Sequence, residues 1–266
     1  MNNNENLLEV TKLRKYFPIK GVKGPGVQAV QDVSFAIKKG ETLGLVGESG
    51  CGKTTLGRTV LRLYEPTGGK IVYDGKVLFD NPLNPDGTPV GKAQSVNMLP
   101  YRRKMQIIFQ DPSASLDPRM TVGEIIGEAI DIHKLAASKK DRDDRIKELL
   151  SRVGLNTEHA NRYPHEFSGG QQQRVGIAQA IVHNPLFVVL DEPTNGLDNA
   201  ARERIIQILQ TLDTARITIS HDWDFLERTS SQYLTIDNGR LDTCAPSLAH
   251  AHLHAHPLGN RPHDHG

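Results

Sequence analysis

The chain has 266 residues, 37% of them apolar, enough to bury a full core in one large domain or in a domain with a subdomain. Its formal net charge of +1 excludes the broad basic field that drives nucleic-acid binding, so we expect no nucleic-acid partner. The two cysteines, Cys51 and Cys244, lie far apart in the sequence, which favours a reducing compartment over a disulfide framework. Because we find neither a signal-peptide pattern nor a long apolar run, we expect any membrane role to be peripheral.

Short strands are predicted between residues 7 and 46, over LLEVTKL, VQAVQDVSFAI and ETLGLV, with a break at GVKGPG. The last strand leads directly into GESGCGKTT, residues 47–55. A helix is predicted from Lys53 to about Tyr64, because Leu56, Val60 and Leu63 recur at helical spacing. Further on, YDGK at 73–76 predicts a hairpin, and 81–92 is a turn-rich excursion.

The second half of the chain first changes to a helical pattern. Residues 121–167 carry hardly any strand signal, and we expect a helical subdomain, at about 111–167, inserted in an α/β core. From residue 168 strands and helices alternate again, and the apolar run LFVVLDE is typical of a parallel strand covered on both faces of a doubly wound sheet. LTIDNGRL predicts another hairpin, and the final 20 or so residues are predicted to be disordered.

The stretch GESGCGKTT fits the pattern Gly-x-x-x-x-Gly-Lys-[Ser/Thr], a loop that holds phosphates on backbone N–H groups at a helix N-terminus. Gly47, Gly50 and Gly52 would let those N–H groups converge on one anion. Lys53 would reach the β and γ phosphates, and the Thr54 hydroxyl would ligate Mg²⁺. The alternative is a glycine-rich turn with a chance lysine, which the strand before and the helix after it disfavour.

Four polar residues follow apolar runs, where ligands meet open α/β sheets. Asp191 would hold the Mg²⁺ shell through water and Glu192 would polarise the attacking water, unless the pair is only a solvated acidic strand end. Gln110 can point from a strand end toward the metal and the water. His221 ends another apolar run, and each of these two, taken singly, is more often structural.

A second helix start lies in FSGGQQQR, residues 167–174. Ser168, Gly169 and Gly170 open a helix that continues through VGIAQAIV, and its first N–H groups form a second potential anion site. A serine N-cap with glycine neighbours would produce the same pattern without any ligand. The stretch alone leaves both interpretations open.

In their order and spacing, GESGCGKTT, Gln110, FSGGQQQR, VVLDEP, NGLD and His221 resemble the ATP-binding subunit of an ATP-binding cassette (ABC) transporter, over about residues 7–243. The resemblance implies an α/β P-loop NTPase fold of the RecA-like type, with a mostly parallel sheet, an antiparallel β subdomain and an inserted α-helical subdomain, in a domain of residues 1–245. It places Walker A at 47–55, the Q-loop at Gln110, the signature at 168–172, Walker B up to Asp191 and Glu192, the D-loop at 195–198 and the switch histidine at His221.

ATP and Mg²⁺ are the cofactors that the resemblance implies. In this family two cassettes meet head to tail, so that the signature of one covers the γ-phosphate bound by the other. We therefore expect a second ATPase subunit and two transmembrane permease subunits, at the cytoplasmic face of the inner membrane. The implied nucleotide-binding residues are Phe17 (with Tyr16 as the alternative for stacking on adenine), Gly47, Ser49, Gly50, Cys51, Gly52, Lys53, Thr54 and Thr55, and, for the second site, Ser168, Gly169, Gly170 and Gln171. The implied metal ligands are Thr54, Gln110 and Asp191, and the implied catalytic residues are Glu192, His221 and Gln110.

Different parts of the chain resemble two different subfamilies. Residues up to about 185 are similar to oligopeptide and dipeptide importer ATPases, a group that also includes nickel importers, whereas residues from about 186 look more like cobalt and nickel energy-coupling-factor ATPases. We expect peptide uptake, with nickel or cobalt import, or a natural or engineered chimera uncoupled from any transporter, as alternatives. A soluble cassette ATPase acting on DNA or ribosomes is disfavoured, because we see neither two cassettes nor a long coiled coil.

The predicted disordered tail, residues 246–266, is rich in histidine. Alternating imidazoles fall on one side of an extended strand and can bind Ni²⁺, Co²⁺ or Zn²⁺. An inert solvated tail or a purification aid is the alternative, because nothing in the sequence fixes a coordination geometry. The histidines concerned are His250, His252, His254, His256, His263 and His265.

Overall fold

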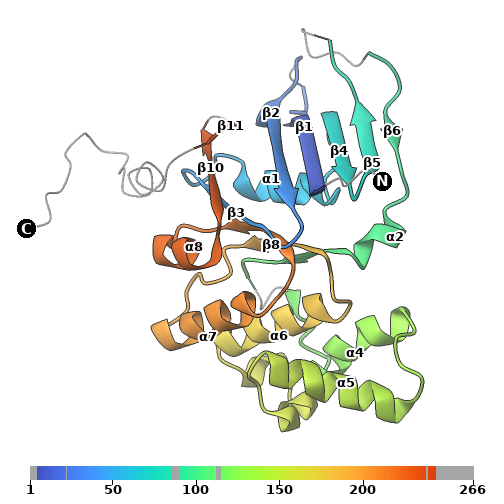
Figure 1. Ribbon diagram of the computed structural model, residues 1–266, viewed down its shortest axis with the longest axis vertical. Helices are drawn as coiled ribbons and strands as arrows, with labels where there is room; N and C mark the ends of the chain where they lie inside the picture. Colours follow the sequence, from blue (N-terminus) through green and yellow to red (C-terminus); the bar gives the residue numbers. More distant parts are fainter. Residues whose placement is uncertain (1–4, 22, 85–89, 112–114, 238, 244–266) are drawn as a thin grey trace, which may run out of the picture.

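Two β-sheets and a group of helices are stacked along the long axis of the molecule (Figure 1). The computed structural model describes residues 5–21, 23–84, 90–111, 115–237 and 239–243. The predicted disorder and metal binding of the histidine-rich tail, and part of the excursion at 81–92, therefore lie outside the described residues. None of the described helices combines the length and the apolar character needed to cross a bilayer.

The first sheet is antiparallel, in the order β2-β1-β4-β5-β6. β4 and β5 form the predicted hairpin, because Asp74 and Gly75 between them adopt φ values of 48° and 73°, as a tight two-residue turn requires. The strands are β1 (Asn6–Phe17), β2 (Val27–Lys38), β4 (Gly68–Tyr73), β5 (Lys76–Asn81) and β6 (Gln94–Ser95).

The second sheet has the order β11-β10-β3-β9-β8-β7 and is parallel except for the β10–β11 hairpin at its edge. Every residue of β3, β8 and β9 is buried, which confirms the prediction of a parallel strand covered on both faces. Because the strands are parallel, their carboxyl ends meet at one edge. The strands are β3 (Thr42–Val46), β7 (Met105–Ile108), β8 (Phe187–Asp191), β9 (Ala215–Ile219), β10 (Gln232–Asp237) and β11 (Arg240–Thr243).

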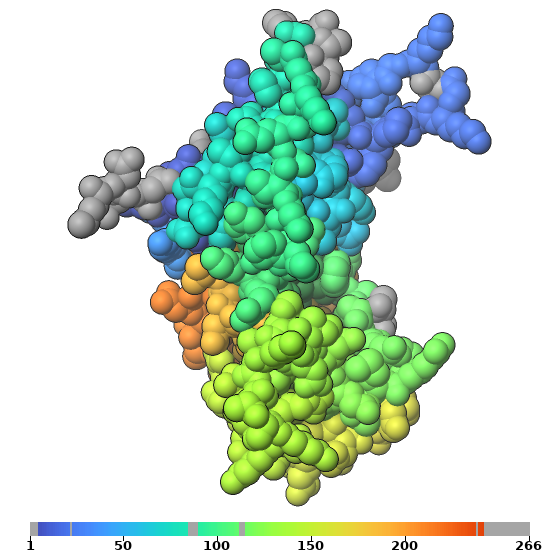
Figure 2. Space-filling view, turned by 90° about the vertical axis from the view of Figure 1, so that its right-hand side faces the viewer, coloured from blue at the N-terminus to red at the C-terminus, as the bar shows by residue number. Residues whose placement is uncertain are grey.

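Helices cover the two faces of this parallel sheet (Figure 1). Helix α1 (Lys53–Val60) lies between the two sheets, and α6 (Gly169–Ile181), α7 (Asn199–Gln210) and α8 (Trp223–Thr229) lie on the other side. The segment before α6 holds α4 (Val122–Ile132), α5 (Lys139–Arg152), and the 3₁₀ turns η1 (Thr157–Asn161) and η2 (Pro164–Glu166). The short α2 (Leu99–Arg102) precedes β7, and Figure 2 shows α4 and α5 forming the lower part of one face.

Strand β8 contributes to both hydrophobic cores. Phe187 and Val189 pack in the core between the two sheets, whereas Val188 and Leu190 pack in the core formed with α4 to α7. This division follows from the pleat, since successive side chains of a strand point to opposite faces. The end of β8, where Asp191 lies, is therefore fixed from both sides of the sheet.

The predicted helix from Lys53 to Tyr64 is too long, because α1 ends at Val60. Arg62 adopts a left-handed φ of 52°, and its Nη1 donates hydrogen bonds to the carbonyls of Leu78 and Val96 at 3.0 and 2.8 Å. These bonds to the antiparallel sheet turn the chain out of the helix. Leu63 is consequently 43% exposed instead of packing in line with Val60.

His183 is expected to make the stability of the fold depend on pH. Burial, followed by the charges of His133 and Arg103, lowers the pKa of His183 from 6.5 to about 4. Between these two values the unfolded chain binds a proton at His183 that the folded chain does not, so the free energy of unfolding falls as the pH falls. We expect a loss of about 1 kcal/mol between pH 7 and pH 5, below the full linkage value because the side chain is partly exposed to solvent.

Urea unfolding of the wild type and of His183→Gln at both pH values measures this loss. The variant should lose less stability than the wild type on acidification. Equal losses in the two proteins would show that other groups cause the pH dependence.

Candidate nucleotide-binding and hydrolysis site

The loop between β3 and α1 has a backbone that only glycine can follow at two positions. Gly47 and Gly52 have φ values of 148° and 104°. A Cβ on Gly47 would lie 2.4 Å from the Ile236 carbonyl oxygen, and one on Gly52 would lie 2.1 Å from the Ala29 carbonyl oxygen. Gly50, with φ of 80°, has nothing within 4 Å of its Cβ position, so this part of the loop stays open to a ligand.

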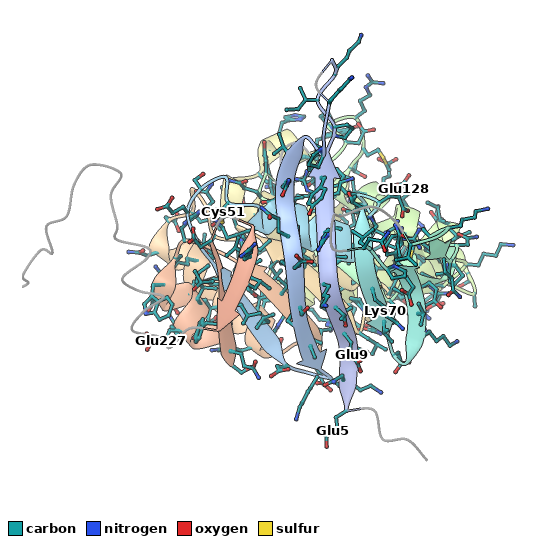
Figure 3. The ribbon with its side chains drawn as sticks, turned by 90° about the horizontal axis from the view of Figure 1, so that it is seen from above. Glu5, Glu9, Cys51, Lys70, Glu128 and Glu227 are labelled. Atoms are coloured by element: carbon teal, nitrogen blue, oxygen red, sulfur yellow. The ribbon has the colours of Figure 1, made fainter. Side chains whose placement is uncertain are left out.

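Lys53, the first residue of α1, is buried inside this loop. Its Nζ donates hydrogen bonds to the carbonyl oxygens of Gly47 and Glu48 at 2.9 and 2.8 Å, and it lies 3.8 Å from the Cys51 sulfur. The ammonium group is thus held within the curve of the loop. In the view of Figure 3, Cys51 marks this loop, well away from Glu5 and Glu9 at the start of β1.

Two carboxylates at the end of β8 lie beside the loop. Asp191 is 1% exposed, and its Oδ1 accepts a hydrogen bond of 2.8 Å from the Thr54 hydroxyl. Burial raises the pKa of Asp191, against the opposing effects of Thr54, Arg58 and Lys53. Helix α1 therefore holds this carboxylate through a hydroxyl that follows directly after the lysine of the loop.

Glu192 and His221 form a second polar pair at the same sheet edge. The His221 backbone N–H donates to Glu192 Oε2 at 3.2 Å, and His221 Nε2 lies 3.2 Å from Glu192 Oε1. Burial raises the pKa of Glu192, and burial together with Lys53 lowers the pKa of His221. Glu192 has a left-handed φ of 48°, and its backbone N–H donates to the Ile219 carbonyl at 2.9 Å, which fixes this conformation.

A pocket of about 480 Å³ opens over the loop and brings most of the predicted residues together. Val27 and Ala29, two residues apart on β2, are part of its wall and were missed at the sequence level, although a period of two does place them on one face. Asn195, from the stretch NGLD, also contributes. The predicted residues that line the pocket are Phe17, Ser49, Gly50, Gly52, Lys53, Thr54, Thr55, Gln110, Glu192 and His221.

Three predicted residues belong to the loop or lie behind it without lining the pocket, namely Gly47, Cys51 and Asp191. Of the two candidate aromatic residues, Phe17 lines the pocket and Tyr16 does not. The Phe17 ring meets the Tyr64 ring edge to face, with centroids 5.5 Å apart and planes at 88°. The position of Phe17 makes it the ring available to a ligand in this pocket.

The start of α6 is separate from the pocket within one protomer. Ser168 caps the helix in a reciprocal arrangement, in which Gln171 N–H donates to Ser168 Oγ at 3.4 Å and Ser168 N–H donates to Gln171 Oε1 at 2.9 Å. Ser168 and Gly169 are exposed, whereas Gly170 is buried, and a Cβ there would lie 2.6 Å from that of Ala201. Ser168 therefore caps α6, as one of the two interpretations of this stretch predicts. None of residues 168–171 lines the pocket.

The chemistry of the donors fits a magnesium nucleotide. Thr54, Asp191 and Gln110 carry hydroxyl, carboxylate and amide oxygens, and oxygens are the ligands that Mg²⁺ prefers. The open loop at a helix N-terminus suits a phosphate chain, and Phe17 offers a ring face to a base. The metal ion, the phosphate chain and the base of a magnesium nucleotide thus each have a matching group in or beside the pocket.

A glycine loop between a buried parallel strand and a helix, with carboxylates at the end of another strand of the same sheet, defines a P-loop nucleoside triphosphatase. A profile of the ABC transporter family matches residues 30–195, and this chain belongs to that family. It is an ATPase of the ABC type, and its fold matches those of ABC ATPases.

Curated relatives align with nearly the whole chain. The oligopeptide transport ATP-binding protein OppF of Bacillus subtilis is 46% identical over 247 residues, covering 91% of this chain and 76% of the relative. OppF of Streptococcus mutans is 39% identical over 259 residues, covering 96% of this chain and 80% of the relative. The dipeptide transport ATP-binding protein DppF of Lactococcus lactis is 40% identical, covering 91% and 75%.

Two solved structures share the fold. The ATP-binding cassette MJ0796, described as a dimer bound to ADP and Pi after hydrolysis, matches with a TM-score of 0.74 and 27% identity, covering 89% of this chain and 98% of that one. The structure of cbiO1 from Clostridium perfringens, part of the ABC transporter complex cbiONQ, matches with a TM-score of 0.72 and 24% identity, covering 94% and 93%. At this identity the second match shows the fold alone.

The comparisons give no support to a junction near residue 185. One natural relative aligns over 96% of the chain, a span that crosses the position where the resemblance changed. The structural match to cbiO1 is expected of any ABC ATPase and does not separate the halves.

Proposed function

We propose that this chain is the ATP-hydrolysing subunit of an importer for oligopeptides or dipeptides. The observation that carries the proposal is the pocket over the glycine loop, which brings most of the predicted residues together in a chain whose curated relatives are named as oligopeptide and dipeptide transport ATP-binding proteins. The subunit would work at the cytoplasmic face of the inner membrane, with a second ATPase subunit and two permease subunits. In this proposal residues 1–245 form the ATPase domain and about 111–167 its helical subdomain.

Each group in the pocket would have one role. The loop N–H groups and Lys53 would hold the phosphates, while Thr54, Gln110 and Asp191 would hold Mg²⁺, which supplies charge neutralisation on the phosphate oxygens. Glu192 would accept a proton from the attacking water, a role favoured by the burial that raises its pKa. His221, within 3.2 Å of Glu192, would hold that carboxylate in place.

The start of α6 would act on the nucleotide of a second subunit. Ser168 and Gly169 are exposed and do not line the pocket of their own protomer, as a site shared between subunits requires. Gly170 would keep the helix start open, and Gln171 would cap it. The predicted D-loop, residues 195–198, would lie beside this helix start, since Leu197 Cδ2 is 3.9 Å from the Cβ position of Gly169 and 3.8 Å from that of Gly170. The dimeric solved relative supports the presence of a second ATPase subunit.

A Ser168→Arg variant is expected to bind ATP as the wild type does but to lose turnover about 100-fold or more, because the bulky cation displaces a preorganised donor facing the second nucleotide. Nucleotide affinity by calorimetry and phosphate release measure the two effects. Ser138→Arg is the matched control, since Ser138 also caps an exposed helix start, that of α5. Unchanged turnover in Ser168→Arg would contradict a shared site.

Transport in proteoliposomes tests the function as a whole. The chain, assembled with its permease subunits and given ATP on its own side, should accumulate a labelled peptide, whereas Glu192→Gln should not. Accumulation of Ni²⁺ or Co²⁺ instead would favour the metal-importer alternative. ATP hydrolysis that no permease stimulates would favour an ATPase uncoupled from transport.

A further inference from the structure

The Phe17 ring is held by two residues that do not belong to the pocket. Lys15 lies two residues earlier on β1, on the same side of the strand, and its Nζ is 4.7 Å from the centroid of the Phe17 ring. Tyr64, which follows α1, meets Phe17 edge to face at 5.5 Å. Neither Lys15 nor Tyr64 lines the pocket, whereas Phe17 does.

Both holding residues are themselves fixed. Lys15 Nζ donates a hydrogen bond of 2.9 Å to the Glu65 carbonyl and lies 5.9 Å from the centroid of the Tyr64 ring. The Tyr64 hydroxyl accepts a hydrogen bond of 3.1 Å from Arg58 Nη1, and the Arg58 guanidinium is 5.8 Å from the same ring. Lys15 therefore donates to the backbone next to Tyr64, at Glu65, which does not line the pocket.

This arrangement has a consequence for binding. A phenylalanine at the end of a strand loses rotamer freedom when it stacks on a ligand, and that loss subtracts from affinity. A ring that a cation and a second ring already hold in place has less freedom left to lose. Within the part of the chain that the structure describes, no hydrogen bond or ion pair joins Lys15 or Tyr64 to Lys53 or to the glycine loop. Arg58, which donates to Tyr64, lies 4.0 Å from Asp191 Oδ2 through its Nη2, so Lys15 is the more independent of the two residues.

We propose that Lys15 and Tyr64 are positioning residues for base recognition, which hold Phe17 so that its ring faces the pocket and stacks on a nucleobase. The inference rests on the proposed function and adds to it the residues that set affinity for the base separately from affinity for the phosphates. It predicts that substituting either residue weakens the binding of ligands that carry a base and leaves the affinity for ligands without a base unchanged.

The test compares ATP with inorganic tripolyphosphate by calorimetry on the full chain. Tyr64→Leu should weaken ATP binding about fivefold, and Lys15→Met about threefold, with tripolyphosphate affinity unchanged in both. Tyr64→Phe keeps the ring and should restore most of the ATP affinity. Phe17→Leu should give the largest fall, because it removes the stacking ring itself.

Lys70→Met is the matched control for the lysine change, because Lys70 pairs with Asp80 at the surface of the antiparallel sheet and lies apart from Cys51 in Figure 3. Equal losses for ATP and tripolyphosphate would show a merely structural role and overturn the proposal, as would no loss at all. Tighter ATP binding by Lys15→Met would show that the lysine competes with the base, which also overturns it. Should Tyr64→Leu fail to fold, Lys15→Met decides between the same outcomes.

The same titrations distinguish failure of the proposed function from failure of the positioning proposal. A wild-type chain that binds neither ATP nor tripolyphosphate would refute the ATPase site itself. A wild-type chain that binds both, and whose ratio of affinities stays the same in every variant, would refute only the positioning of Phe17.

Discussion

A Glu192→Gln variant is expected to hydrolyse ATP about 1000-fold more slowly than the wild type while binding ATP equally well. The amide keeps the shape of the side chain and can still contact His221, but it cannot accept the proton of the attacking water. Because hydrolysis reopens a dimer closed on ATP in the proposed function, the variant should also accumulate as a dimer. Phosphate release and light scattering with ATP measure the two effects.

Glu203→Gln provides the control for this change, since Glu203 pairs with Arg228 on the surface between α7 and α8 and lies outside the pocket. It should keep wild-type turnover. A monomeric and fully active Glu192→Gln protein would remove Glu192 from the catalytic step and leave the raised pKa of its carboxyl group as an effect of burial alone.

Lys53→Ala is expected to weaken ATP binding about 10- to 100-fold, because a charge-assisted hydrogen bond to phosphate is lost. The change also removes the donor that holds the Gly47 and Glu48 carbonyls, so the loop should lose its shape even before a ligand enters. Calorimetric titration with ATP and with tripolyphosphate measures the effect, which should be similar for the two ligands because Lys53 faces the phosphates.

Lys39→Ala serves as the comparison, because Lys39 pairs with Asp74 at the surface. Its affinity for ATP should equal that of the wild type. If Lys53→Ala bound ATP as tightly as Lys39→Ala, the glycine loop would not be the phosphate site.

The sequence predicts the chemical groups of the site better than the walls around them. Lys53, Asp191 and Glu192 lie at ends of elements whose pattern is strong, a buried strand or a glycine loop, so their positions follow from the order of the elements. Val27 and Ala29 were missed because their place in the pocket depends on how the antiparallel sheet packs over the loop, which no local pattern records.

The end of α1 and the choice between Phe17 and Tyr16 also depend on distant contacts. Apolar spacing extends to Leu63, but hydrogen bonds from Arg62 to two other segments end the helix earlier. Neighbouring residues on a strand point to opposite faces, so one of the two aromatic residues must face away from the pocket. Only the register of β1 shows that it is Tyr16.

Because the side chains of β8 alternate between two hydrophobic cores, we expect those cores to unfold together. Phe187 and Val189 anchor the strand in one core while Val188 and Leu190 anchor it in the other, so neither core can disorder without releasing the shared strand. The acidic end of that strand would then shift with it. A destabilising substitution in the helical part of the molecule, far from the nucleotide, should therefore lower the rate of hydrolysis by displacing the end of β8.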